Sequence, residues 1–187
     1  MTEPHTAPST TASAAPASSR TPSHPPLVVV GGVSGSGKST VGSQLAAALG
    51  VPFIDGDSLH SAANIEKMSA GHPLTDDDRL PWLETVGRTL GEHASGGLVV
   101  ACSALRRRYR ELIRAEAPGV FFVVLTGPRE VLEQRLGDRP GHFMPASLLD
   151  SQLATLEPLE PGEHGAEVAF TDAPADIVTE IEGALGA

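Results

Sequence analysis

The amino-acid sequence predicts an α/β fold, in which helices flank a parallel sheet. The first observation is that apolar, strand-sized runs alternate with segments of helical periodicity along most of the chain. The second is the run Leu-Val-Val-Val-Gly-Gly at residues 27–32, since continuous β-branched stretches are typical of central parallel strands. The third is size, because 187 residues, 40% of them hydrophobic, suffice for one domain with its own core.

Each element has its own signal in the sequence. After residues 27–32, apolar runs predict further strands at 51–54, 98–102, 120–125 and 167–170. Helical periodicity predicts helices at 40–49, 81–93, 105–115 and 129–136. Pro174 suits the first turn of a closing helix, whose buried face would carry Ile177, Ile181 and Leu185.

Residues 1–26 differ from the rest of the chain in composition. They are almost entirely Ser, Thr, Ala and Pro and include no Leu, Ile, Val or aromatic residue. Such a segment buries too little apolar surface to offset its conformational entropy. It also has neither the apolar stretch of a secretory signal nor, with Arg20 alone, the arginines of a mitochondrial presequence. We expect a disordered tail over 1–26 and a single domain over 27–187.

Charge and cysteine content exclude several classes of protein. The formal net charge of -10 repels polyanions, so no nucleic-acid partner is expected, and no apolar run is long enough for a membrane span. Residues 140–187 contain no Lys or Arg, which predicts a solvated acidic surface there. Cys102 is the only cysteine, which favours a reducing cytoplasm and a buried strand-end role.

The strongest chemical signal is the sequence Gly-Val-Ser-Gly-Ser-Gly-Lys-Ser at residues 32–39. It matches the phosphate-binding P-loop motif and lies between a predicted strand and a predicted helix, as that motif requires. Its glycines allow backbone N–H groups to surround phosphate oxygens, Lys38 would reach the β- and γ-phosphates of a nucleotide, and Ser39 would bind Mg²⁺. The predicted nucleotide-binding residues are Gly32, Ser34, Gly35, Ser36, Gly37, Lys38, Ser39 and Thr40.

Two carboxylates follow the second predicted strand. Asp55 and Asp57 are two residues apart, so on a strand their side chains would share a face at the edge where α/β sheets bind ligands. Asp55 could then hold the water shell of Mg²⁺ while Asp57 accepts a proton from an attacking hydroxyl. An Asp-Gly-Asp sequence is also common in ordinary turns.

Beyond these motifs, the sequence resembles the gluconokinases of the shikimate-kinase-like group of P-loop small-molecule kinases. The resemblance extends from the P-loop through residues 55–83, 102–114 and 139–161, including the string Asp-Gly-Asp-Ser-Leu-His, and departs from the family at Ser61, where proline is common. It implies a P-loop kinase fold with a five-stranded parallel sheet and a mobile lid. It also implies a homodimer that uses ATP to phosphorylate D-gluconate to 6-phospho-D-gluconate.

The sugar acid presents a carboxylate and several hydroxyls, which call for guanidinium and other polar groups. Arg79 and Arg106 are candidates for the carboxylate clamp, although Arg79 could instead pair with the acids at 76–78 and Arg106 could lie on a solvated helix face. His60, Asn64 and Lys67 would share one side of a helix and line the pocket.

The sequence Arg-Pro-Gly-His-Phe at residues 139–143 resembles the lid of related kinases, in which an arginine reaches the transferred phosphate. Arg139 is the preferred lid arginine over Arg135, and His142 is a further substrate-binding candidate.

Two other functions remain open at this point. The chain could be another small-molecule kinase of the same fold, or a nucleotide-dependent switch that orients water with a Gln or Glu.

Overall fold

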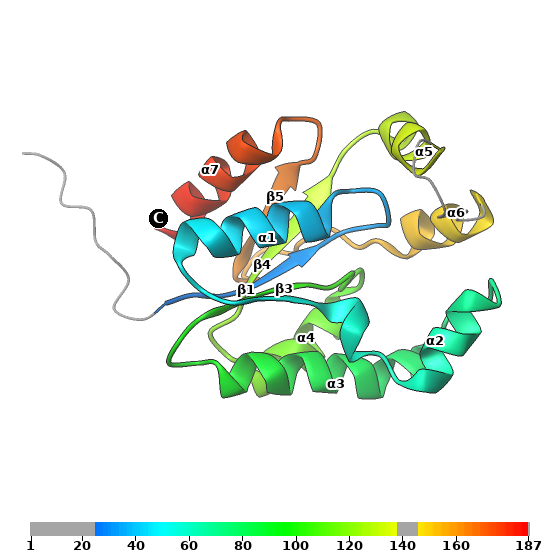
Figure 1. Ribbon diagram of the computed structural model, residues 1–187, viewed down its shortest axis with the longest axis horizontal. Helices are drawn as coiled ribbons and strands as arrows, with labels where there is room; N and C mark the ends of the chain where they lie inside the picture. Colours follow the sequence, from blue (N-terminus) through cyan, green and yellow to red (C-terminus); the bar gives the residue numbers. More distant parts are fainter. Residues whose placement is uncertain (1–24, 138–145, 187) are drawn as a thin grey trace, which may run out of the picture.

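The computed structural model describes residues 25–137 and 146–186 of the chain. Within these residues, five parallel strands form one sheet in the order β2-β3-β1-β4-β5 (Figure 1). The strands are β1 (Leu27–Gly31), β2 (Phe53–Asp55), β3 (Leu98–Ala101), β4 (Phe121–Thr126) and β5 (Gly165–Ala169). The helices are α1 (Lys38–Leu49), α2 (Ala62–Ser69), α3 (Asp76–Glu92), α4 (Arg107–Glu116), α5 (Arg129–Gly137), α6 (Ala146–Thr155) and α7 (Pro174–Leu185). A short 3-10 helix, η1 (Gly56–Leu59), follows β2.

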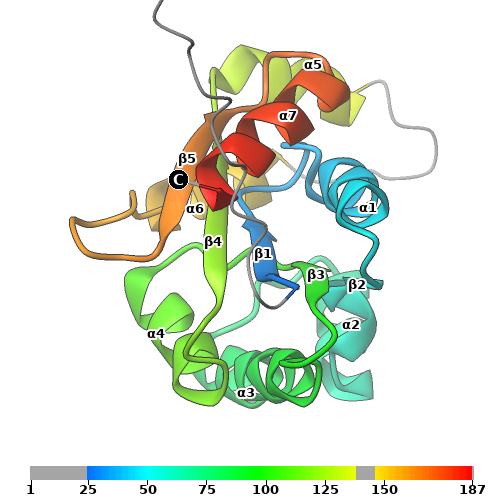
Figure 2. The ribbon, with the colours of Figure 1, turned by 90° about the vertical axis from the view of Figure 1, so that its left-hand side faces the viewer.

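Helices cover both faces of the sheet, which explains why β1 is continuously apolar. Val28 and Val30 belong to the core that includes residues of α1 and α7, whereas Leu27 and Val29 belong to the core that includes residues of α3 and α4. Figure 2 shows α3 and α4 on one side of the strands and α1 and α7 on the other. The predicted five-stranded parallel α/β fold is therefore confirmed.

The strand order determines where a ligand site can form. From β1 the chain moves to one side to build β2 and β3, then crosses to the other side of β1 to build β4 and β5. Ligands of open α/β sheets bind at such a switch point, beyond the carboxyl ends of the strands. Here the loops after β1 and β3 are joined by a hydrogen bond of 3.1 Å from the Gly32 N–H to the Ser103 carbonyl.

Several element boundaries differ from those that the sequence predicts. The helix expected from residue 81 begins at Asp76, because Thr75 and Asp78 form a capping box that satisfies its first turn, and Pro81 lies inside it. α6 corresponds to no helix expected from periodicity. β2 is also shorter than expected and ends at Asp55, where η1 begins.

The ends of the described residues limit what can be said of two expectations. Most of the tail expected at 1–26 lies outside them, and Pro26 contacts the sheet through a hydrogen bond of 3.1 Å from the Leu98 N–H to its carbonyl. Arg139 and His142, the residues expected in a lid, also lie outside the described residues. Over the part of the chain that the structure does describe, no helix is both long and apolar enough to cross a bilayer.

Candidate active site

The loop between β1 and α1 has the backbone of an anion site. Gly37 is the residue before α1 and has a φ of 96°, a left-handed conformation that favours glycine. No side chain caps this end of α1, so its first N–H groups are available to an anion. Ser36 is buried, and its hydroxyl has no hydrogen-bond partner among the described residues. Lys38 Nζ donates to the Val33 carbonyl at 3.0 Å, which keeps the ammonium against the same loop.

Ser39 and Asp55 meet at the edge of this loop. Ser39 Oγ donates a hydrogen bond of 2.7 Å to Asp55 Oδ2, although the two residues lie on different elements. Asp55 Oδ1 accepts from the Asp57 N–H at 3.1 Å, which fixes the orientation of the carboxylate. A hydroxyl and a carboxylate beside a phosphate loop are the oxygen ligands that Mg²⁺ uses together with substrate phosphates. The two residues therefore fit the expected metal.

Asp57 does not lie on a strand, so the expectation that Asp55 and Asp57 share a strand face is wrong. β2 ends at Asp55, and the chain turns at Gly56 into η1. A Cβ on Gly56 would lie 2.5 Å from the Ala101 carbonyl oxygen, so only glycine fits against β3 at this position. The turn separates the two carboxylates: Asp55 faces Ser39, and Asp57 is exposed at the start of η1.

Trp82 supports this turn from α3, and sequence reasoning gave it no role. Its indole N–H donates to the Gly56 carbonyl at 2.8 Å, and its ring stacks on His60 with 4.0 Å between ring centroids. Burial lowers the pKa of His60, Asp57 raises it, and Arg79 lowers it further. The net effect is a lowered pKa, which favours a neutral imidazole beside Asp57 at pH 7.

The expected helix carrying His60, Asn64 and Lys67 is only partly correct. His60 ends η1 and precedes α2, although its Nδ1 lies 3.4 Å from Asn64 Nδ2. Asn64 also donates to the Asp78 carbonyl at 2.8 Å, and Lys67 Nζ lies 2.5 Å from Asp78 Oδ2. Asn64 and Lys67 thus fasten α2 to the start of α3, and the hydrogen bond from Lys67 is the largest cause of the lowered pKa of Asp78.

Three arginines lie around the ring of Tyr109, next to the first turn of α3. The guanidinium carbons of Arg79, Arg106 and Arg108 lie 5.9, 5.8 and 5.4 Å from its centroid. Asp76 is their shared acidic neighbour: it lies 3.7 Å from Arg79 and 3.4 Å from Arg106, pairs with Arg108, and accepts from the Tyr109 hydroxyl. One carboxylate against three guanidiniums leaves an excess of positive charge, which suits an anionic ligand.

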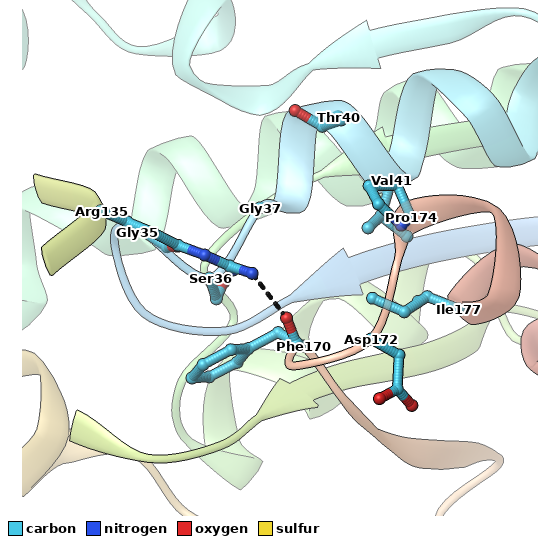
Figure 3. Close-up of a pocket in the computed structure, with 10 residues that line it drawn as sticks. All are labelled: Gly35, Ser36, Gly37, Thr40, Val41, Arg135, Phe170, Asp172, Pro174 and Ile177. Carbon is cyan, nitrogen blue, oxygen red and sulfur yellow. Dashed lines mark hydrogen bonds between the residues drawn. The ribbon is translucent and has the colours of Figure 1, made fainter. Parts of the chain in front are cut away.

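A cavity of about 190 Å³ lies on the other side of the phosphate loop (Figure 3). Arg135 of α5 crosses its edge: Nη2 donates to the Phe170 carbonyl at 2.8 Å, and the guanidinium carbon lies 5.4 Å from the centroid of the Phe170 ring. The lining residues are Gly35, Ser36, Gly37, Thr40, Val41, Arg135, Phe170, Asp172, Pro174 and Ile177. The cavity joins the phosphate loop to an apolar wall and a flat guanidinium.

Comparisons with known proteins decide the family. Residues 27–159 match the family model of an AAA domain. A gluconokinase of Gluconobacter oxydans (strain 621H) is 53% identical over 135 residues, which cover 71% of this chain and 76% of that protein. The crystal structure of a gluconokinase from Sinorhizobium meliloti 1021 is 50% identical with a TM-score of 0.80, over 86% of this chain and 91% of that one. The chain belongs to the gluconokinase family.

The fold is shared more widely than the gluconokinase family. Shikimate kinase from Aquifex aeolicus has a TM-score of 0.55 at 20% identity, over 84% of this chain and 95% of that one. That likeness concerns the fold alone. Within the gluconokinase family, the similarity extends over most of both chains, as the resemblance in the sequence predicts.

This gluconokinase-family chain also contains a buried ion pair that sequence reasoning missed. Arg110 and Glu163 are 0% and 3% exposed, and the guanidinium donates two hydrogen bonds of 2.8 Å to the carboxylate. Arg110 also donates to the carbonyls of Glu157 and Pro158 at 3.1 and 3.0 Å. The arginines of the basic segment at 106–110 therefore have different partners. Arg106 lies beside Asp76 and Tyr109, whereas Arg110 binds the segment after α6. Helical spacing would place two residues four apart on the same face, so it did not indicate this difference, which arises because Arg106 precedes α4 with an extended backbone.

Proposed function

We propose that this chain transfers the γ-phosphoryl group of ATP to the terminal hydroxyl of D-gluconate, which yields ADP and 6-phospho-D-gluconate. The observation that carries the proposal is the position of the Asp55-Gly56-Asp57 turn. The carboxylate of Asp55 contacts the phosphate loop through Ser39. The carboxylate of Asp57 lies at the start of η1, which leads to His60 and toward the arginine cluster of Arg79, Arg106 and Arg108. A nucleotide site and an acceptor site therefore share one turn.

The phosphate loop and the cavity next to it would bind the nucleotide. The backbone and hydroxyls of the loop, with Lys38, would surround the phosphates. The nucleobase would occupy the cavity between Arg135 and Ile177, where a guanidinium and apolar groups offer stacking surfaces. The residues proposed to bind ATP are Gly32, Ser34, Gly35, Ser36, Gly37, Lys38, Ser39 and Thr40.

Mg²⁺ would be held by Ser39, directly, and by Asp55, through its water shell. The ion supplies charge neutralisation between the β- and γ-phosphates when it is bound. Asp55 is prepared for this role because both its oxygens are already oriented, by the Asp57 N–H and the Ser39 hydroxyl.

The acceptor side combines a base with a carboxylate clamp. Asp57 would accept the proton of the attacking hydroxyl as the oxygen–phosphorus bond forms and the bond between the β–γ bridging oxygen and the γ-phosphorus breaks. Arg79 and Arg106 would bind the gluconate carboxylate, held in place by Asp76 and Tyr109.

Other polar residues complete the proposed acceptor site. Neutral His60 would hydrogen-bond a sugar hydroxyl, while Asn64 and Lys67 would shape the wall behind it. Arg139 and His142 are proposed as lid residues that close on the phosphates and the sugar acid.

A panel of acceptors tests the substrate. ADP release would be measured with gluconate, other sugar acids, shikimate and glucose, which lacks the carboxylate. We expect kcat/KM for glucose to be at least ~10³-fold lower than for gluconate, because buried donors would remain unpaired. Comparable rates on glucose and gluconate, or a clear preference for shikimate, would contradict the proposal.

Arginine variants test how the carboxylate is bound. Arg79→Ala and Arg106→Ala should each lower kcat/KM for gluconate by about 10²-fold while changing the slow glucose reaction little. Arg88→Ala is the matched control, because Arg88 is an exposed arginine on the same helix as Arg79. An effect of Arg79→Ala but not of Arg106→Ala would assign the carboxylate to Arg79 alone.

We also propose that the enzyme acts in the cytoplasm as a homodimer. The cytoplasm is supported by the cysteine content, because Cys102 is the one cysteine of the sequence and so cannot form a disulfide within the chain. Its thiol is buried, and burial raises its pKa to about 12. The homodimer is supported by the family resemblance, and light scattering of the purified protein tests it.

A further inference from the structure

Gln152 of α6 contacts the phosphate loop directly. Its side-chain oxygen, Oε1, accepts a hydrogen bond of 2.7 Å from the backbone N–H of Ser34. Ser34 is the second of the four variable positions in the Gly-x-x-x-x-Gly-Lys-Ser motif. A side chain from near the end of the chain thus reaches the loop on which the nucleotide phosphates would lie, and none of the roles assigned above includes it.

The helix that carries Gln152 is fixed on several sides. Leu149, one turn earlier, is 2% exposed and belongs to the core that covers one face of the sheet. Asp150 pairs with Arg129 of α5 at 2.6 Å. Just beyond α6, the Glu157 N–H donates to the Leu105 carbonyl at 2.8 Å. In Figure 1, α6 lies at the same end of the molecule as the loop that follows β1. Gln152 is therefore presented to the phosphate loop by a rigid element.

The hydrogen bond also determines which way the side-chain amide faces. A backbone N–H can only donate, so it selects the carbonyl oxygen of the glutamine and leaves the NH₂ group on the other branch of the planar amide. This NH₂ group, Nε2, makes no hydrogen bond within the described residues. Two N–H donors thus lie next to the phosphate loop. The carbonyl, which could have oriented an attacking water, is already bound to Ser34.

We propose that Gln152 is a further catalytic residue, whose carbonyl is held by Ser34 and whose NH₂ group donates to the terminal phosphate of the bound nucleotide. The inference rests on the proposed function, because it deepens the account of the same transfer. Gln152 gains and loses no proton: it stabilises negative charge on the γ-phosphoryl oxygens while Asp57 takes the proton of the acceptor. Its donors would be in place before the nucleotide binds.

Substitution by glutamate separates this role from a structural one. Gln152→Glu keeps an oxygen that can accept from the Ser34 N–H, but it replaces the donor with a charged acceptor. We expect kcat with gluconate to fall at least ~100-fold, as when one preorganised donor to a developing charge is lost. Gln152→Leu, which removes both groups, should show a similar loss. Gln44→Glu is the matched control, since it adds the same charge at an exposed position of α1.

Nucleotide binding provides a readout that does not depend on the acceptor. Gln152→Glu should weaken binding of a non-hydrolysable ATP analogue by about 10-fold or more while changing ADP affinity less than about 3-fold, because ADP lacks the γ-phosphate. Calorimetry of both variants and of Gln44→Glu would measure this difference, and thermal unfolding would show that each variant is folded.

The outcomes separate the inference from the proposed function. Wild-type turnover by Gln152→Glu, or equal weakening of the ATP analogue and ADP, would show that Gln152 only holds the loop and would overturn the inference. A wild-type protein that does not phosphorylate gluconate would instead refute the proposed substrate. The difference between the ATP analogue and ADP would still decide the role of Gln152.

Discussion

At the scale of single residues, the turn at Gly56 assigns different partners to two identical side chains. Asp55 is held between the Ser39 hydroxyl and the Asp57 N–H, on the side of the phosphate loop. Asp57, one residue beyond the turn, is exposed. It lies close enough to His60 that its charge opposes the lowering of the His60 pKa by burial. The two different roles proposed for these carboxylates, holding the metal and accepting the proton, thus depend on one backbone bend.

We therefore expect Asp57→Asn to separate binding from chemistry. An amide cannot accept the proton of the acceptor hydroxyl, so kcat should fall by at least ~10²-fold while ATP affinity stays within about 3-fold of wild type. Asp55→Asn should mainly raise the Mg²⁺ concentration required for activity. If Asp57→Asn stays active and Asp55→Asn does not, the two roles are reversed.

The glycine itself can be tested by adding one methyl group. Gly56→Ala would place a Cβ 2.5 Å from the Ala101 carbonyl oxygen, so the turn must shift away from β3 and carry Asp57 with it. We expect a loss of about 1–3 kcal/mol in unfolding free energy and at least a ~10-fold loss in kcat.

Gly119→Ala is the control for this variant, because a Cβ there meets no atom within 4 Å. Steady-state kinetics and denaturant unfolding of both variants measure the difference. An active, stable Gly56→Ala protein would mean that the turn has more room than the backbone contact indicates.

At the scale of elements, the start of α3 positions the residues that are proposed to bind the acceptor. Thr75 and Asp78 form its capping box, and Asp78 also binds Lys67 of α2. The same first turn carries Asp76, around which the arginines gather, and Arg79. Capping of one helix therefore positions both α2 and the arginine cluster.

Thr75→Ala should destabilise the protein by about 1–2 kcal/mol, because it removes the side chain that accepts from the Asp78 N–H. Thr85→Ala serves as the control, since the Thr85 hydroxyl only donates to the Pro81 carbonyl within α3 and alanine favours the helix interior. Thermal unfolding compares the two variants. Equal melting temperatures would show that Asp78 and Lys67 hold the helix end without Thr75.

Local patterns in the sequence predicted the sheet and the phosphate loop, but not the contacts between distant segments. The apolar run of β1 and the glycines after it are local signals, and the structure places both as expected. The capping box at Thr75 was also readable, yet periodicity suggested a later start. By contrast, the contact of Gln152 with Ser34 joins residues that are 118 positions apart, which no local pattern encodes. The same holds for the burial of Arg110 against Glu163.

At the scale of the whole molecule, the segment after α6 is bound to α4. The Arg110 guanidinium donates hydrogen bonds to the Glu163 carboxylate and to the carbonyls of Glu157 and Pro158. The Glu157 carboxylate accepts from the Arg107 N–H at 2.7 Å. The carboxylate of Glu163 has its pKa lowered to about 2, chiefly by the hydrogen bond from Arg110. A lowered pKa means that the ionised form stabilises the fold.

The sign of this shift predicts acid sensitivity. The stabilisation is fully present above the unfolded value of 4.5 and is lost as the pH falls from there toward about 2. Glu163→Gln should cost about 3–5 kcal/mol at pH 7, because it leaves Arg110 buried without its charge partner, and its stability should depend less on pH below 4.5.

Denaturant unfolding at several pH values tests this prediction. Glu160→Gln is the control, since Glu160 forms an exposed pair with Arg107 and its loss should cost less than about 1 kcal/mol at pH 7. The assignment would be wrong if Glu160→Gln and Glu163→Gln lost equal stability, or if both kept the acid sensitivity of the wild type.

The strand order has a consequence for folding during synthesis on the ribosome. β1 is the first strand to be synthesised, but its hydrogen-bonding neighbours are β3 and β4, and β4 ends only at Thr126. Until those strands emerge, both edges of β1 remain without their native partners, and its apolar side chains have no sheet to enter. The segment that carries the phosphate loop therefore leaves the ribosome early and gains its native surroundings late. In this order of assembly, the nucleotide site becomes complete only after most of the chain has been made.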